Sequence, residues 1–298
     1  MKILEIKNLV KTYGALRAVD NVSFDIHKGE IFGLLGPNGA GKTSLISTVM
    51  TLEKINSGQV SVCGYDVQKH PSLTKSFTGF MPQDIIIHGY FTVREVIKFY
   101  SGFCGVWPDG DRIDYLLKRL NLWEQRNSKV RTLSGGMKRR LLIVKALVHS
   151  PKLLLLDEPT AGVDIQLRNN LWEFIKELKQ ETSILFTTHY LEEAEKLCDR
   201  VAFIHKGKIR QMGETHRLIS HLTTRKILIK FKTDKLIKNK HYSGKNEEDY
   251  EVFLLPYSLT AGQLLKELNL DMNEIQDLKV KEGSLEDVFN SVTEAQDA

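Results

Sequence analysis

The sequence predicts an α/β fold whose core is a mostly parallel β-sheet. Residues 31–35, 153–156 and 183–187 are short, continuous apolar runs, the pattern of strands that are covered on both faces. Helical patterns at 42–52 and 165–180 follow the first two runs. Strands that alternate with helices along a chain form a parallel sheet with helical crossovers.

Two segments predict additions to this core. Apolar and polar side chains alternate through the first thirty residues, which favours an antiparallel β-subsheet rather than a strand buried on both faces. Residues 92–122 are helical in pattern and interrupt the alternation of strands and helices. We therefore expect an inserted helical lobe, extending over about residues 92–150.

The end of the chain predicts a small α+β appendage. Beyond residue 213, a strand pattern occupies 225–232 and helical patterns occupy 258–268 and 284–292. The 298 residues are enough for one large or two modest domains. We expect a larger core domain at 1–213 and the appendage at 214–298.

The composition is that of an average globular protein and excludes several classes. Forty-two basic and 37 acidic residues give a net charge of +5, and 42% of the residues are hydrophobic, so wholesale disorder and collagen are disfavoured. No apolar run approaches the roughly 20 residues that cross a bilayer, and the N-terminus lacks a signal peptide's apolar core. The three cysteines are odd in number and far apart, which predicts buried free thiols in a reducing cytoplasm.

The average charge conceals a strong asymmetry in the appendage. Residues 225–245 carry eight basic groups against Asp234 alone, for a net charge of +7, whereas residues 247–298 carry −10. The basic segment is suited to anionic lipid headgroups; the alternative, which we favour, is a solvated face partly balanced by the acids that follow. Nucleic acid is disfavoured as a partner because no aromatic residues are interleaved with the basic ones.

A phosphate-binding pattern follows the first apolar run. It fits G-x-x-x-x-G-K-[ST] between a predicted strand and a predicted helix, as that motif requires. Its glycines let backbone N–H groups surround phosphates, Lys42 reaches the β- and γ-phosphates, and the Thr43 hydroxyl is an oxygen ligand for Mg²⁺. The predicted nucleotide-binding residues are Gly36, Pro37, Asn38, Gly39, Ala40, Gly41, Lys42, Thr43 and Ser44.

Two further motifs carry chemistry. Asp157 and Glu158 end the apolar run at 153–156; Asp157 is suited to hold Mg²⁺, and Glu158 to act on an attacking water as general base. The second motif stands directly before a helical pattern, with Ser134 as the N-cap of that helix. Its two glycines carry no side chains, so an anion could approach the backbone N–H groups at the helix N-terminus. Its residues are Leu133, Ser134, Gly135, Gly136 and Met137.

Together with Gln83, His189 and residues 161–164, these motifs resemble the ATP-binding subunit of an ABC transporter, in the family's order over about residues 1–213. The resemblance implies that Tyr13 stacks on adenine, that Gln83 joins Mg²⁺ and the water to the membrane partner, and that His189 contacts the γ-phosphate. It also implies that Asp164 lies at a dimer seam. The alternatives are packing for Tyr13 and plain polar surface for Gln83 and His189.

One departure from the family pattern indicates a particular branch of the family. Met137 stands where the signature commonly has Gln, and residues 138–140 continue it as Lys-Arg-Arg. This run, with residues 188–195 and 284–289, resembles bacterial subunits that work with separately encoded six-helix exporter permeases. We interpret the side chains of 138–140 as a solvated helix face, the alternative being a place near the phosphates.

The resemblance implies ATP and Mg²⁺ as ligands, and as partners a second copy of the chain and integral-membrane permease subunits at the cytoplasmic face of the inner membrane. Each copy would use its partner's residues 134–136, and the lobe at 92–122 would contact the permease. One competing class is a soluble ABC-type ATPase of translation or repair, which a single ATP site and the lack of heptads disfavour. Another is a regulatory module that holds ATP unhydrolysed, which Glu158 and His189 disfavour.

Overall fold

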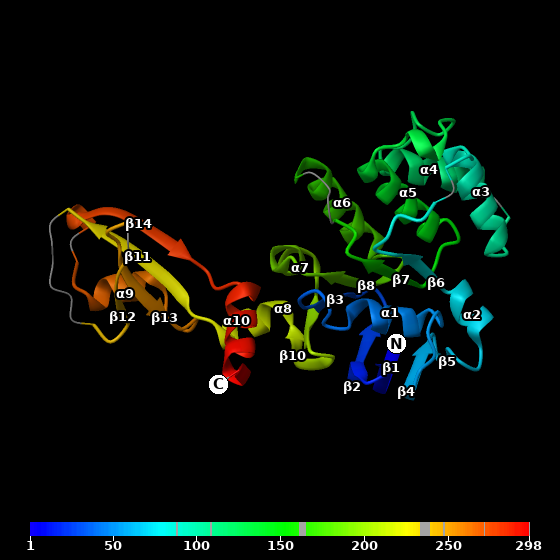
Figure 1. Cartoon of the computed structure of the whole chain (residues 1–298). Helices are drawn as coiled ribbons and strands as arrows, with labels where there is room; N and C mark the ends of the chain where they lie inside the picture. The colour runs from blue at the N-terminus through cyan, green and yellow to red at the C-terminus, as the bar shows by residue number, and fades with distance from the viewer. Residues whose placement is uncertain are drawn as a thin grey trace. The chain divides into compact units, whose positions relative to one another are not determined.

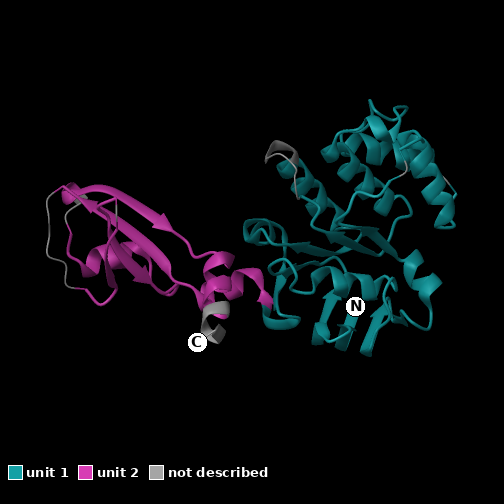
Figure 2. Cartoon of the chain, in the orientation of Figure 1, with its two compact units in different colours: residues 1–212 teal, residues 213–298 magenta. Residues whose placement is uncertain are grey.

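The structure is a computed structural model of the chain (Figure 1). It describes residues 1–298 apart from 88, 108, 161–164, 233–238, 247, 271 and 298, and omits the side chains of 165–167, 272 and 293–297. The chain divides into two compact units, Met1–Met212 and Gly213–Ala298 (Figure 2).

A six-stranded sheet forms the core of the first unit. Its order is β10-β9-β3-β8-β7-β6, and the pairs β3–β9, β3–β8, β7–β8 and β6–β7 are parallel. Every residue of β3, β7 and β8 is buried, which confirms the parallel core that the apolar runs predict. The strands are β3 (Ile31–Leu35), β6 (Thr78–Met81), β7 (Leu153–Asp157), β8 (Ser183–Thr188), β9 (Arg200–His205) and β10 (Lys208–Glu214).

Helices connect the parallel strands, as the pattern predicts. The helix expected at 42–52 is shorter, because Thr51 has a left-handed φ of 54° that ends it. The helix expected at 165–180 ends two residues earlier. The helices beside this sheet are α1 (Lys42–Val49), α2 (Pro71–Ser76), α6 (Ile165–Leu178) and α7 (Leu191–Leu197).

The N-terminal region forms the expected antiparallel subsheet. Its order is β2-β1-β4-β5, and β1 pairs antiparallel with both β2 and β4. Inward side chains such as Leu4 and Ile26 share one buried core with Phe32 of the parallel sheet and Ile46 of α1. The strands are β1 (Lys2–Tyr13), β2 (Leu16–His27), β4 (Ser57–Val62) and β5 (Tyr65–Asp66).

The expected helical lobe is present, and residues 92–122 hold two helices. Thr92 caps the first helix through a capping box with Glu95. Gly105, at φ 74°, follows the end of that helix, and Asp109 caps the next one. The lobe consists of α3 (Val93–Phe103), α4 (Gly110–Arg119), the 3₁₀ turn η1 (Val130–Thr132) and α5 (Gly135–Leu147).

The second unit is a separate α+β fold with its own core. A four-stranded sheet of order β12-β13-β11-β14 buries Ile227, Ile229 and Phe253 together with Leu264 of α9. Its elements are α8 (Thr215–Leu222), β11 (Arg225–Phe231), β12 (Tyr242–Lys245), β13 (Glu251–Leu255), α9 (Ala261–Glu267), η2 (Met272–Glu274), β14 (Ile275–Lys281) and α10 (Leu285–Asp297).

Acids of the second unit lie beside its basic residues. Arg225 Nε is 2.9 Å from Glu282 Oε1, and Lys226 Nζ is 3.5 Å from Asp287 Oδ1. Lys245 Nζ is 3.3 Å from Asp249 Oδ1. These pairs support the internally balanced interpretation of the charge asymmetry rather than the lipid-binding one.

Candidate active site

The phosphate loop (residues 36–43) leaves the buried end of β3 and enters α1. Two of its glycines are required by close backbone contacts. A Cβ at Gly36 would lie 2.2 Å from the Ile204 carbonyl oxygen, and one at Gly41, where φ is 108°, would lie 2.2 Å from that of Ala18. The loop is therefore held against β9 and β2 while the N-terminus of α1 follows it directly, with Ser44 in its first turn, an arrangement suited to phosphate.

Lys42 is buried and folds back over the loop. Its Nζ donates hydrogen bonds to the carbonyl oxygens of Gly36 (2.8 Å) and Pro37 (3.1 Å). The same Nζ lies 3.4 Å from Glu158 Oε1, with only 5% and 7% of the two side chains exposed. The ammonium is thus desolvated and balanced by the carboxylate at the end of β7.

Asp157 joins the phosphate loop to β8. Its Oδ2 accepts a hydrogen bond from Thr43 Oγ1 at 2.9 Å, and its Oδ1 accepts one from Thr187 Oγ1 at 2.5 Å. Burial raises the pKa of the Asp157 carboxyl, and the two hydroxyl donors oppose that shift. Sequence reasoning did not identify Thr187, because its place beside Asp157 follows from the pairing of β7 with β8.

Glu158 is the point at which the predicted site residues converge. Besides Lys42, its carboxylate lies 3.4 Å from Gln83 Nε2 and 3.3 Å from His189 Nδ1. The backbone of Glu158 has a left-handed φ of 50°, and its N–H donates to the Thr187 carbonyl oxygen at 3.1 Å. Non-glycine residues rarely adopt this φ, and such strain is common at functional sites.

The solvated-face interpretation of residues 138–140 is wrong for the two arginines. Arg139 Nη1 donates to the Glu158 carbonyl oxygen at 2.6 Å, and its Nη2 donates to that of Gln83 at 3.5 Å. Burial lowers the pKa of the Arg139 guanidinium, while Glu158 and Asp84 oppose this. Arg140 Nη1 donates to the Leu120 carbonyl oxygen at 2.9 Å, so both side chains turn into the protein.

Residues 133–137 form the capped start of α5. Leu133 is buried and anchors the turn, and Ser134 Oγ accepts a hydrogen bond from the Met137 N–H at 3.3 Å. A Cβ added to Gly135 or Gly136 would meet no atom within 4 Å. Within this chain the two glycines thus face open space at the start of a helix.

Of the two remaining predicted residues, the structure describes Tyr13. Tyr13, at the end of β1, is 42% exposed, and Lys11 Nζ lies 4.6 Å from its ring centre. Asp164 lies outside the described residues.

The side chains near the phosphate loop fit magnesium only together with phosphate oxygens. Among the described residues, no group of three or more His, Cys, Asp or Glu side chains is placed to hold a metal ion. The Thr43 hydroxyl and the Asp157 carboxylate are two adjacent oxygen donors, and Mg²⁺ is characteristically held by one or two such groups plus substrate phosphates.

Comparisons with known proteins point to one family. A sequence profile of the family described as "ABC transporter" matches residues 19–161. The linearmycin resistance ATP-binding protein LnrL of Bacillus subtilis (strain 168) is 40% identical over 224 residues, which are 74% of this chain and 72% of that protein. Nod factor export ATP-binding protein I of Ralstonia nicotianae is 37% identical over 74% of this chain and 69% of its own length.

Solved structures show the same fold. The structure of an ATP-binding subunit of an ABC transporter has a TM-score of 0.67 at 28% identity, covering 72% of this chain and 91% of that one. An ATP-binding cassette of an ABC transporter in its ADP conformation has a TM-score of 0.63 at 28% identity, covering 73% and 92%. In the part of the chain that the structure describes, no helix has the length and apolarity needed to cross a bilayer. The chain belongs to the ABC transporter family, as an ATP-binding subunit with ATPase activity.

Proposed function

We propose that this chain hydrolyses Mg·ATP at a head-to-tail dimer interface and thereby drives a separate membrane permease, in the direction of export. The observation that carries the proposal is the convergence on Glu158. Its carboxylate lies within 3.4 Å of Lys42 Nζ, Gln83 Nε2 and His189 Nδ1, at the edge of the sheet where the phosphate loop begins.

The phosphate loop provides the substrate contacts. Lys42 and the N–H groups at the start of α1 would bind the β- and γ-phosphates. Thr43 and Asp157 would hold Mg²⁺, which neutralises charge that develops on the phosphates. Because a triphosphate carries more negative charge than one carboxylate, it would compete with Glu158 for the Lys42 ammonium.

Glu158 would then act on the attacking water. Freed from Lys42, its carboxylate can accept a proton from the water or orient it, the role expected of a carboxylate placed beside a phosphoryl group. His189, 3.3 Å away, would contact the γ-phosphate, and Gln83 would link this arrangement to the permease. Tyr13, exposed at the end of β1, would stack on adenine.

A second copy of the chain would complete each site. Residues 134–136 present two unobstructed glycines and a serine-capped helix start, which is suited to a phosphate held by the partner copy. Asp164 would lie at the seam between the copies. A γ-phosphate held between two chains contacts both of them only when the dimer is closed. ATP therefore favours the closed dimer, and loss of the γ-phosphate by hydrolysis favours its opening.

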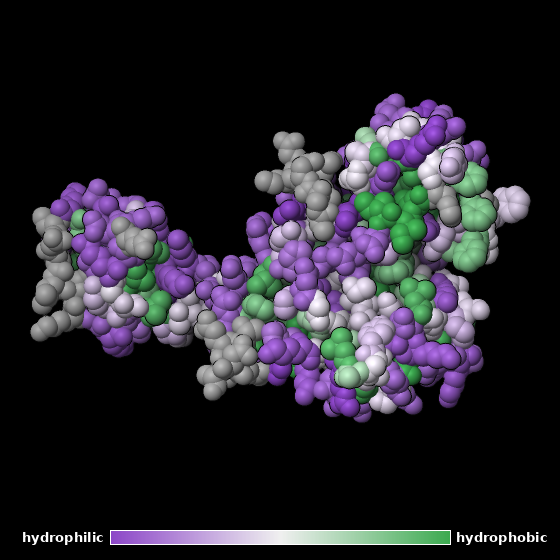
Figure 3. Space-filling view, viewed as in Figure 1, coloured by the Kyte–Doolittle hydropathy of each residue, from purple (hydrophilic) through white to green (hydrophobic). Residues whose placement is uncertain are grey.

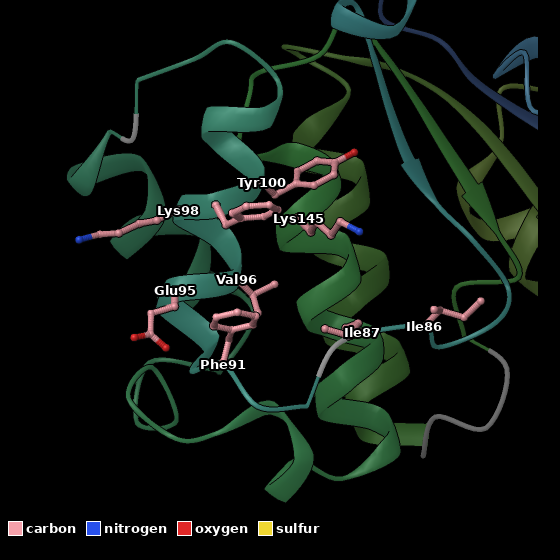
Figure 4. A pocket seen from close by; sticks show the side chains of 9 residues that line it. Ile86, Ile87, Phe91, Glu95, Val96, Lys98, Tyr100 and Lys145 are labelled. Atoms are coloured by element: carbon pink, nitrogen blue, oxygen red, sulfur yellow. The ribbon is translucent and has the colours of Figure 1, made fainter.

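The helical lobe offers the surface for the permease. A groove of about 520 Å³ lies on it, and apolar side chains from α3 and from the segment before it form most of its wall (Figure 4). Hydrophobic side chains also gather over the lobe in Figure 3. Phe99 is 78% exposed, and patches of this kind mark protein interfaces. The groove is lined by Ile86, Ile87, Phe91, Glu95, Val96, Lys98, Phe99, Tyr100 and Lys145.

A permease segment in this groove would place the chain at the cytoplasmic face of the inner membrane. Export is favoured because LnrL is named for resistance to linearmycin and the other relative for export of Nod factor. Those cargoes belong to those systems, and the names favour a transporter subunit over a soluble translation or repair factor.

The substitution Glu158→Gln tests the proposal. It keeps the shape of the side chain but removes the base, so phosphate release should fall about 10²- to 10³-fold while ATP binding is retained. The variant should therefore form an ATP-dependent dimer on a sizing column. Glu192→Gln, at an exposed position on α7, is the matched control. Wild-type turnover in Glu158→Gln would refute the role of Glu158, and a monomer at saturating ATP would refute the shared site.

A further inference from the structure

Glu193 is a buried carboxylate with no assigned role. It lies in the first turn of α7 and is 1% exposed. Its Oε2 accepts hydrogen bonds from Thr160 Oγ1 at 2.8 Å and from Thr188 Oγ1 at 3.0 Å, and its Oε1 lies 3.6 Å from Arg168 Nε. Burial raises the pKa of the Glu193 carboxyl, and these three partners oppose the shift. A buried ionisable group is costly unless its partners compensate.

The two threonines stand next to the residues at which hydrolysis would occur. Thr160 comes two residues after Glu158 and follows the end of β7, whereas Thr188 ends β8 directly before His189. Thr188 Oγ1 also accepts a hydrogen bond from the Tyr190 N–H at 2.9 Å, so the backbone is tied across His189. One carboxylate thus connects the chain segments that carry both groups.

We propose that Glu193 is a positioning residue that sets the separation between the Glu158 carboxylate and the His189 imidazole by holding Thr160 and Thr188. The proposal rests on the proposed function, since it takes Glu158 and His189 as the groups that act on water and phosphate. Their separation is 3.3 Å here. Displacements of about 1 Å in such a constellation reduce turnover roughly 10²-fold.

The contacts explain why removal of the Glu193 carboxylate should lower the rate of hydrolysis and leave ATP binding unchanged. Thr160 and Thr188 are both 1% exposed, so loss of the carboxylate leaves two buried hydroxyl groups without their acceptor. An unsatisfied buried group is costly, and the chain relaxes to satisfy it. The strand ends that carry Glu158 and His189 would shift, whereas Lys42, bonded within its own loop, would not.

The test compares Glu193→Ala, Glu193→Gln and the exposed control Glu192→Ala for phosphate release. In Glu193→Ala we expect kcat to fall about 10- to 100-fold and the KM for ATP to stay within about threefold of wild type. Glutamine keeps one carbonyl oxygen for both threonines, so Glu193→Gln should retain kcat within about threefold of wild type. Equal kcat in the two alanine variants, or equal loss in Glu193→Gln and Glu193→Ala, would overturn the proposal.

A second pair of variants protects the test against misfolding. Thr160→Val and Thr188→Val keep side-chain volume and remove one hydroxyl donor each, and each should lower kcat about three- to tenfold. The ¹⁵N signals of the His189 imidazole, assigned by their loss in His189→Ala, should move in both valine variants but not in Glu192→Ala. Unmoved signals with wild-type kcat in both would contradict the proposal.

The proposed function and the positioning role fail differently. If Glu158→Gln hydrolyses ATP at the wild-type rate, the assignment of the active site is wrong. If Glu158→Gln is inactive while Glu193→Ala turns over normally, the active site stands and only the role of Glu193 is refuted.

Discussion

Arg139 is expected to support catalysis through the backbone of Glu158. Its guanidinium donates to the Glu158 carbonyl oxygen at 2.6 Å and reaches the Gln83 carbonyl oxygen at 3.5 Å. Glu158 has a φ of 50°, a conformation that costs about 1–3 kcal/mol for a non-glycine residue and persists only where its surroundings enforce it. Arg139→Met removes the donors and keeps an unbranched side chain that suits a helix.

The size of the effect follows from the bond that is lost. A hydrogen bond from a charged donor contributes about 1.5–3 kcal/mol, which is comparable to the strain at Glu158. A loss of about 2 kcal/mol corresponds to a factor of roughly 30 in an equilibrium constant. We therefore expect kcat for ATP hydrolysis to fall about 5- to 30-fold, with ATP affinity unchanged, because Arg139 has no hydrogen bond to the phosphate loop among the contacts described.

The assay is phosphate release at saturating Mg·ATP, together with equilibrium binding of a fluorescent ATP analogue. Lys138→Met is the matched control, since it removes a neighbouring positive charge from the same helix. Arg139→Lys, which retains a single cationic donor group, should fall between wild type and Arg139→Met. A kcat for Arg139→Met equal to that of Lys138→Met would refute the reasoning, as would a loss confined to ATP affinity.

Two further predictions concern a buried carboxylate and the helical lobe. Burial raises the folded-state pKa of Asp157 above its unfolded-state pKa. Between these two pKa values the folded chain keeps the proton that the unfolded chain has lost, so this group's contribution to stability falls as the pH rises from the lower pKa through the higher one. Asp157→Asn should therefore flatten the decline in melting temperature above the ordinary aspartate pKa and abolish stabilisation by Mg·ATP; an unchanged pH slope would contradict this. Phe99→Asp places a charge in the apolar groove and should reduce co-purification with the permease subunits at least tenfold, whereas Tyr65→Asp, on β5, should not; equal recovery of both would exclude the groove.

Much of the fold could be predicted because its signals are local. The apolar runs at 31–35 and 153–156 coincide with β3 and most of β7, since strands covered on both faces need apolar side chains at every position. The break between α3 and α4 was not located within the helical pattern expected at 92–122, although Gly105, at φ 74°, and the cap Asp109 lie between the two helices.

The site residues that lie within a short sequence motif could be predicted. Those that reach the site through the packing of neighbouring strands and helices could not. The sequence pattern points to Lys42 and Glu158, and the structure brings their charged groups to 3.4 Å. Thr187 lies in no motif, and the runs that contain Arg139 and Glu193 indicated a branch of the family but not the contacts of these two side chains. The partners of the three residues lie 30, 19 and 33 residues away in the chain, so only packing brings them together.

The sequence by itself therefore determined the fold class, the phosphate loop between a strand and a helix, and the paired carboxylates at a strand end. Each of these follows from the composition or spacing of a few consecutive residues. The tertiary structure decided that β7 lies beside β8. This pairing brings the Thr187 hydroxyl to the Asp157 carboxylate and the His189 imidazole to the Glu158 carboxylate. It also decided that two arginines expected in solvent turn inward, because buried carbonyl oxygens at the ends of other elements require donors.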